Sequence, residues 1–193
     1  MDREIRAWAV SGLGLETRAD KAPMLRGHAA LFDTLSEDLG GFREKIARGA
    51  FAEAVGRDDV RFLVNHEGLP LARTASKTLR LAEDARGLAF EADLDPADPD
   101  VARLMPKIAR GDLTQMSFAF HVMPDGQDWG QDTDGTVVRT VKKVRLSDVS
   151  VVTFPAYTAT DVARRSLDDW RKIHARPSAP LNLLRALQAQ ASI

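Results

Sequence analysis

Three polar residues stand inside apolar, strand-like segments, and their types are those of a nucleophile, a base and a carboxylate. Ser117 lies in GDLTQMSFAFHV, His66 ends the run VRFLVNH, and Asp148 lies within VRLSDVSVV. A serine hydroxyl is a poor nucleophile until a base removes its proton. A carboxylate can orient that base and stabilise its charged form. Together the three residues indicate nucleophilic acyl transfer.

The four histidines differ in their fitness as that base. His121 shares the Ser117 strand but lies four residues along it, about 13 Å at strand rise, and His174 lies in a polar tail. His28 and His66 remain, and His66 is favoured because it opens a polar loop directly after a buried strand. A lone histidine at a strand end can also be purely structural, and a carboxylate at 148 can face water on an edge strand.

The serine strand alternates with a period of two. This alternation separates a core face with Met116, Phe118 and Phe120 from a second face with Ser117 and Ala119. Because the second face carries small side chains, we expect Ser117 to lie on an open face that a substrate can approach.

The composition excludes several classes of protein. The chain has 193 residues, 27 basic against 28 acidic side chains, and no cysteine. Disulfides, thiolate metal sites and a cysteine nucleophile are therefore excluded, and a reducing compartment is favoured. The balanced charge favours neither nucleic acid nor a membrane as partner. No segment approaches the roughly 18 apolar residues that span a bilayer, so we expect a soluble cytoplasmic protein.

Short strands dominate the expected structure. Strands are predicted at 5–10, 24–33, 60–66 and 116–122, a hairpin at 79–94 and a strand pair within 136–157, with a loop at 125–135. Helices are predicted near 51–55 and, after an Asp98 N-cap and Pro99, up to Gly111; Pro106 predicts a kink or a late start. We expect one mainly β domain over 1–160, a barrel or barrel-like sheet with helices packed outside. A polar or helical tail follows over 161–193, with an apolar helix at 181–190.

Five motifs in this order resemble the tailed-bacteriophage prohead proteases, which are related to the herpesvirus assemblin serine proteases. They are RGHAALFD, EKIARGAF, FLVNHE, ARGDLTQMSFAF and LSDVSVVTFPAY, spanning about residues 24–157. The resemblance implies an antiparallel β-barrel wrapped by helices. It also implies that Ser117 is the nucleophile, His66 the general base and Asp148 the orienting acid, the member of the set that varies most in the family.

The resemblance further implies a serine endopeptidase without metal or cofactor. Its partners would be the major capsid protein with its scaffold segment and a second copy of itself, inside an immature capsid in the host cytoplasm. Backbone amides or an arginine, with Arg139 and Arg145 as candidates, would stabilise the oxyanion. The tail would direct packaging or be removed by self-cleavage, and the source would be a phage, a prophage or a gene transfer agent. The alternatives are a non-catalytic assembly or scaffolding protein, a metal site using His28, His66 or His121, and a small binding module.

Overall fold

The computed structural model describes residues 3–9, 13–16, 22–154 and 161–174, and strands are the main regular structure among them. In chain order the elements are β1 (Glu4–Ala9), β2 (Gly14–Glu16), β3 (Met24–Leu31), β4 (Arg43–Ile46), α1 (Ala52–Arg57), β5 (Arg61–Val64), β6 (Glu67–Arg73), β7 (Leu79–Glu83), β8 (Gly87–Asp93), α2 (Pro99–Ala109), β9 (Gln115–Val122), β10 (Gln127–Gln131), β11 (Val137–Val141), β12 (Val144–Val152) and α3 (Asp161–His174).

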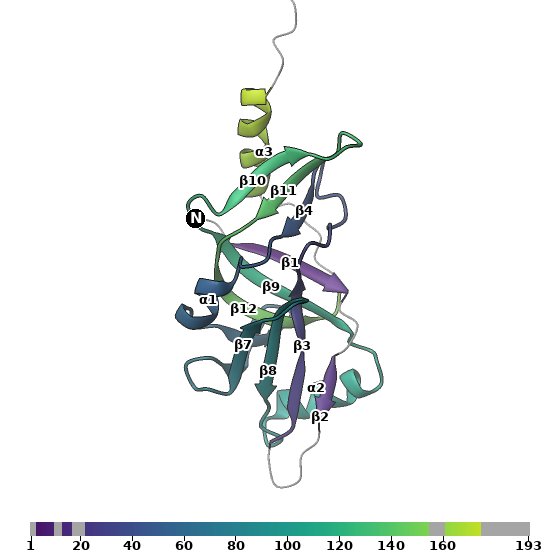
Figure 1. The fold of residues 1–193 in the computed structure, drawn as a ribbon. Helices are drawn as coiled ribbons and strands as arrows, with labels where there is room; N and C mark the ends of the chain where they lie inside the picture. Colours follow the sequence, from purple (N-terminus) through teal and green to yellow (C-terminus); the bar gives the residue numbers. More distant parts are fainter. Residues whose placement is uncertain (1–2, 10–12, 17–21, 155–160, 175–193) are drawn as a thin grey trace, which may run out of the picture. The chain divides into compact units, whose positions relative to one another are not determined.

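The described strands pair into three sheets (Figure 1). The largest has the order β1-β9-β12-β5-β6, the second β2-β3-β8-β7 and the third β10-β11-β4. Most neighbouring strands are antiparallel, but β4 with β11 and β5 with β12 are parallel. The prediction of a mainly β fold with packed helices is confirmed, while these pairings define three sheets and show no barrel closure.

Aromatic side chains join the sheets through a shared core. Phe62 of β5 packs against Phe90 of β8, with ring centroids 5.6 Å apart. Phe118 of β9 meets Phe51, just before α1, edge to face at 5.5 Å. The core face predicted for β9 is confirmed by three fully buried side chains, Met116, Phe118 and Phe120. One face of the five-stranded sheet is therefore fixed by packing, and its other face carries the polar residues.

Helix α2 begins as the sequence predicts. The Asp98 carboxylate accepts the Asp100 N–H at 2.8 Å, and Pro99 occupies the first turn. Gly111 follows the helix end with a φ of 79°, a conformation that glycine adopts without strain. Pro106 lies inside the helix, so the predicted late start was wrong. Three buried apolar residues at helical spacing hold α2 on the core, Val101, Leu104 and Ile108.

Two expectations around the third sheet were wrong. The predicted loop at 125–135 contains strand β10, because Trp129 packs against Phe42 at 5.0 Å and gives a largely polar segment an anchor. The two strands predicted at 136–157 exist, but β11 and β12 belong to different sheets. The chain leaves one sheet for the other at Lys142 and Lys143, whose backbone N–H groups both bond the Gly126 carbonyl.

The chain divides into two units, Met1–Thr160 and Asp161–Ile193. Within the second, α3 is described, and its Trp170 ring stacks on His174 at 4.6 Å. The predicted apolar helix at 181–190 lies outside the described residues. In the described part of the chain, no helix combines the length and the apolar run needed to cross a membrane.

Candidate active site

The structure brings Ser117, His66 and Asp148 into one hydrogen-bonded chain. The His66 Nδ1 atom lies 2.6 Å from Asp148 Oδ1, and its Nε2 atom lies 2.7 Å from Ser117 Oγ. These are short, direct hydrogen bonds. The side chains of His66 and Asp148 are 8% and 4% exposed, and Ser117 is fully buried. The imidazole can therefore accept the hydroxyl proton through one nitrogen while the carboxylate holds the other.

Adjacent central strands position the serine and the carboxylate. Ser117 on β9 stands directly opposite Ser150 on β12, and Asp148 is two residues before Ser150. Residues two apart on a strand point to the same face. All three polar groups consequently project from the face of the sheet opposite the phenylalanine core.

A β-bulge at Ser147 makes this placement possible. Leu146 pairs with Phe120 on the core face, but Asp148 pairs with Ala119 on the other face, so Ser147 is the extra residue. In a regular ladder Asp148 would stand opposite a core phenylalanine and its carboxylate would enter the apolar core. A bulge that re-aims a side chain is common beside functional sites.

His66 lies in a two-residue turn between β5 and β6. Val64 pairs with Glu67, and both turn residues, Asn65 and His66, have positive φ values of 53° and 62°. Tight hairpin turns with two positive φ angles match the twist of the strands, and asparagine suits the first position, where glycine usually follows. A histidine in place of that glycine costs free energy, which is typical of a functional constraint.

Asn65 fastens this turn to the end of β12. Its backbone N–H donates to the Val151 carbonyl at 2.9 Å, and its side-chain amide donates to Thr153 Oγ1 at 3.2 Å. In return, the Thr153 N–H donates to Asn65 Oδ1 at 2.9 Å. The turn therefore places the imidazole across β12 toward Ser117, and the three hydrogen bonds of Asn65 hold the turn in place.

Two residues that sequence reasoning missed complete the surroundings of Asp148. The Ser150 hydroxyl donates to Asp148 Oδ1 at 2.9 Å, and the Arg3 guanidinium pairs with Oδ2 at 2.5 Å. Burial raises the pKa of the Asp148 carboxyl, but the His66 hydrogen bond and charge, with Ser150 and Arg3, bring it below its ordinary value. Asp148 is therefore ionised at neutral pH and can stabilise an imidazolium.

A local sequence pattern could have predicted Ser150 but not Arg3. Ser150 is two positions after Asp148, so strand alternation alone would have placed it beside the carboxylate. Arg3 is 145 residues away from Asp148 along the chain, and no local pattern connects them.

Ser117 is not on an open face, contrary to the sequence expectation. Its Oγ lies 2.8 Å from the Arg6 backbone carbonyl on β1 as well as 2.7 Å from His66. A hydroxyl has one proton, so it donates either to this carbonyl or to the imidazole. Only the hydrogen bond to the imidazole places the hydroxyl proton where His66 can remove it.

The remaining predicted candidates lie elsewhere. The Arg139 guanidinium is buried between Glu4 and Glu44, and Arg145 stands opposite His121, about 13 Å along the sheet from Ser117. His28 pairs with Asp84 at 2.7 Å. Burial, followed by the charge of Arg145, lowers the pKa of His121. Neither arginine is placed to bind an oxyanion at the serine.

No metal-binding group was found in the described part of the chain, where no three histidine, aspartate or glutamate side chains gather suitably. Access to the imidazole comes from a hollow of about 300 Å³ lined by Asn65, His66, Val152, Thr153 and Phe154. The site can therefore meet a peptide from the side of the β5–β6 turn.

A buried serine, a histidine bridging it to an ionised carboxylate, and a mainly β scaffold are together the arrangement of a serine hydrolase. Comparison with known proteins gives the family. A model described as caudovirus prohead serine protease matches residues 13–173, and the chain belongs to this family.

Two known proteins are similar to the chain, one in sequence and one in fold. The chain is 29% identical over 147 residues to the prohead protease of Enterobacteria phage HK97; the match covers 74% of the chain and 60% of that protein's length. The fold is similar to that of the bacteriophage T4 capsid assembly protease, gp21, with a TM-score of 0.53 and 11% identity over 78% of this chain and 96% of that one.

Proposed function

We propose that the chain is a serine endopeptidase of prohead maturation. His66 removes the proton from Ser117, whose Oγ attacks a peptide carbonyl and forms an acyl-enzyme that water then hydrolyses. Asp148 holds the imidazole in the tautomer with a free Nε2 and stabilises its charged form. The observation that carries this proposal is His66 itself, 2.7 Å from Ser117 Oγ and 2.6 Å from Asp148 Oδ1.

The family supports the substrates as well as the chemistry. By likeness to proteins named prohead protease and capsid assembly protease, we infer that the chain acts on capsid protein, on its scaffold segment and on itself, inside an immature capsid in the host cytoplasm. We also propose that residues 1–160 form the protease domain, and that residues 161–193 direct packaging or are removed by self-cleavage. A barrel-like closure of the three sheets and a homo-oligomer belong to the same proposal.

The test distinguishes two serines that face each other. Wild type, Ser117→Ala and Ser150→Ala are each co-expressed with the cognate capsid protein, and cleavage is followed by gel and mass spectrometry. We expect no cleavage by Ser117→Ala, whereas Ser150→Ala keeps its nucleophile and cleaves more slowly. Capsid protein processed normally by Ser117→Ala would overturn the proposal.

A non-catalytic assembly protein is the second candidate, and the full burial of Ser117 favours it. It predicts that neither wild type nor Ser117→Ala cleaves capsid protein while capsids still assemble. The retention of all three groups at hydrogen-bonding distance supports the protease instead, because a carboxylate buried in a strand is costly when it serves no purpose.

A further inference from the structure

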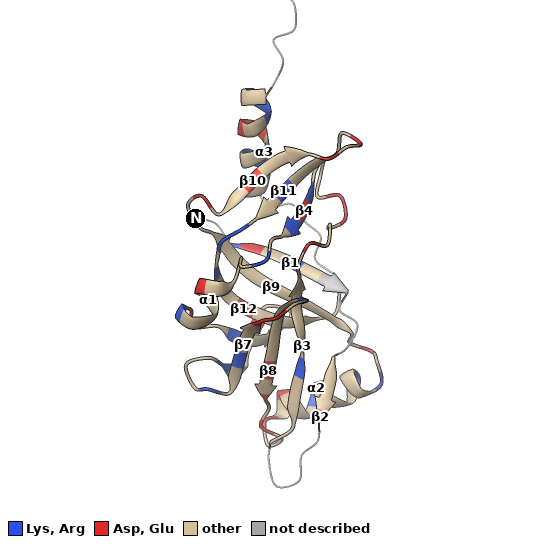
Figure 2. Ribbon diagram, in the orientation of Figure 1, with Lys and Arg blue, Asp and Glu red and all other residues tan. Residues whose placement is uncertain are grey.

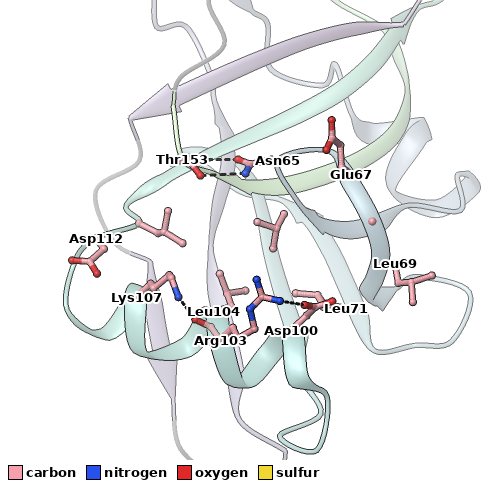
Figure 3. A pocket seen from close by; sticks show the side chains of 13 residues that line it. Asn65, Glu67, Leu69, Leu71, Asp100, Arg103, Leu104, Lys107, Asp112 and Thr153 are labelled. Atoms are coloured by element: carbon pink, nitrogen blue, oxygen red, sulfur yellow. Dashed lines mark hydrogen bonds and ion pairs between the residues drawn. The ribbon is translucent and has the colours of Figure 1, made fainter.

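A cavity of about 530 Å³ lies beside the turn that carries His66, between strand β6 and helix α2 (Figure 3). Its apolar wall consists of Val64, Leu71, Leu104 and Leu113. Figure 3 shows Leu104 on α2 with Arg103 and Lys107 along the same helix. Cavities of this size with apolar walls and a few polar groups are typical of binding sites.

The cavity lies next to the hollow that contains His66. Asn65 and Thr153 line both this cavity and the smaller hollow that contains His66. Two hydrogen bonds join these two residues (Figure 3). A peptide bound at the hollow can therefore extend into the cavity.

The strand beside the cavity leaves part of its backbone outside the sheet. β6 is the last strand in the order of its sheet, and no other described strand pairs along its far side. Its register jumps from Glu67, opposite Val64, to Ala72, opposite Phe62, so residues 68–71 share a single partner position. Such an edge can add an extended peptide through main-chain hydrogen bonds while side-chain pockets give specificity.

We propose that this cavity is a subsite of the protease and holds an apolar side chain of the substrate, with the peptide extended along β6. The inference rests on the proposed function, because it identifies the occupant as the peptide to be cleaved. It also accounts for Leu69, which is 80% exposed on β6 and would be partly covered by a bound peptide. Apolar contact of this kind favours leucine-like over acidic side chains at one substrate position.

Binding is tested without cleavage. Ser117→Ala protein labelled with ¹⁵N is titrated to millimolar concentration with acetyl-Gly-Ser-Leu-Ser-Gly-amide, and in parallel with the peptide that has Asp in place of Leu. We expect the leucine peptide to shift the amide resonances of Leu71, Leu104 and Leu113 and the aspartate peptide to shift them far less. Equal shifts with both peptides, or shifts confined to other surfaces, would overturn the subsite.

Cavity blocking gives the second arm. Arg103 is 79% exposed at the cavity rim, so Arg103→Trp fills the cavity without disturbing the core; Arg86→Trp changes another exposed arginine, in the β7–β8 turn outside the cavity. In the otherwise wild-type chain, we expect Arg103→Trp to lower kcat/KM for capsid protein about tenfold and Arg86→Trp to leave it unchanged. Unchanged cleavage by Arg103→Trp contradicts the subsite.

The two proposals fail in different ways. Selective binding of the leucine peptide by a protein whose wild type never cleaves would overturn the protease and leave an apolar peptide site. Cleavage that depends on Ser117 but is indifferent to Arg103→Trp would retain the protease and overturn the subsite. A spectrum of ¹⁵N-labelled Arg103→Trp and of Arg86→Trp, recorded before their activities are compared, identifies a variant that misfolds.

Discussion

At the scale of single residues, the Asp148 carboxylate organises the candidate site. It accepts from His66 and Ser150 on one oxygen and pairs with Arg3 through the other, while its side chain is 4% exposed. An uncompensated charge at this depth would be costly, and the three partners offset that cost. The carboxylate therefore fixes the imidazole and depends on the sheet around it.

Replacing this carboxylate should cost most of the activity. In Asp148→Asn the amide can present its NH₂ to His66 Nδ1, which favours the tautomer whose Nε2 carries a proton and cannot accept one from Ser117. We expect kcat to fall by about 10³ to 10⁴, measured as single-turnover cleavage of capsid protein. An unchanged rate would leave a Ser117–His66 dyad and remove Asp148 from the site.

The same carboxylate should contribute to acid sensitivity. Because the folded state lowers the pKa of Asp148, its contribution to the free energy of unfolding is complete above the unfolded value of about 3.9 and is lost as pH falls through the folded value. We expect the stability difference between wild type and Asp148→Asn to be constant well above pH 4 and to shrink as the pH falls below about 4 in urea titrations. A difference that stays constant with pH would contradict this assignment.

At the scale of elements, two local departures from regular strands build the site. The bulge at Ser147 turns Asp148 away from the core, and the turn at Asn65 and His66 carries the imidazole over β12. Each places a polar group where a regular ladder would not. The rest of the five-stranded sheet follows simple alternation.

The anchoring of this turn can be separated from its backbone strain. Asn65→Gly and Asn65→Ala both remove the hydrogen bonds to Thr153, but only glycine adopts the positive φ without a steric penalty. We expect kcat/KM to fall about 10- to 100-fold in both variants, because His66 is then no longer held in position to accept the proton of Ser117. Alanine should also lower the free energy of unfolding by about 1 kcal/mol more than glycine, measured by urea denaturation.

The sequence predicted which residues form the candidate site, but not how the strands place them. Period-two counting identified the core face of β9, strand rise excluded His121, and the position at the start of a polar loop favoured His66. The bulge also has a sequence signal that was overlooked, because the buried apolar positions of β12 change from even numbers, Val144 and Leu146, to odd numbers, Val149 and Val151. That change of parity requires one extra residue between them.

Other features could not be read locally. The closure over Ser117 depends on the Arg6 carbonyl of β1, a main-chain atom that every residue type possesses. Strand β10 depends on Trp129 reaching Phe42 more than 80 positions earlier in the chain. Both are consequences of tertiary pairing, which overrides local composition.

At the scale of the whole molecule, a buried cluster of four charges joins the five-stranded and three-stranded sheets. Glu4 and Arg6 on β1 meet Glu44 on β4 and Arg139 on β11, all at most 1% exposed. Figure 2 shows acidic and basic positions on these three strands. Burial raises the pKa of the Glu4 carboxyl, but Arg139 and Arg6 together lower it by more than burial raises it. The pKa of Glu4 is therefore below its ordinary value.

Removing one charge from this cluster should destabilise the protein. Glu44→Gln leaves two buried guanidinium groups with a single carboxylate, and we expect the free energy of unfolding to fall by about 3 to 5 kcal/mol. Urea denaturation measures this loss, and Glu53→Gln, an exposed glutamate on α1, is the control with little effect. A loss below about 1 kcal/mol would show that the cluster relaxes or admits water.

The position of β12 in its sheet has a consequence for synthesis on the ribosome. Among the described residues it is the last strand of the first unit in sequence, yet it lies between β9 and β5 in the middle of the five-stranded sheet. Until it emerges, the sheet consists of two separate pieces, β1-β9 and β5-β6, and Asp148 is absent. A nascent chain thus carries Ser117 and His66 for many residues without an assembled candidate site, which can form only after nearly the whole unit has been translated.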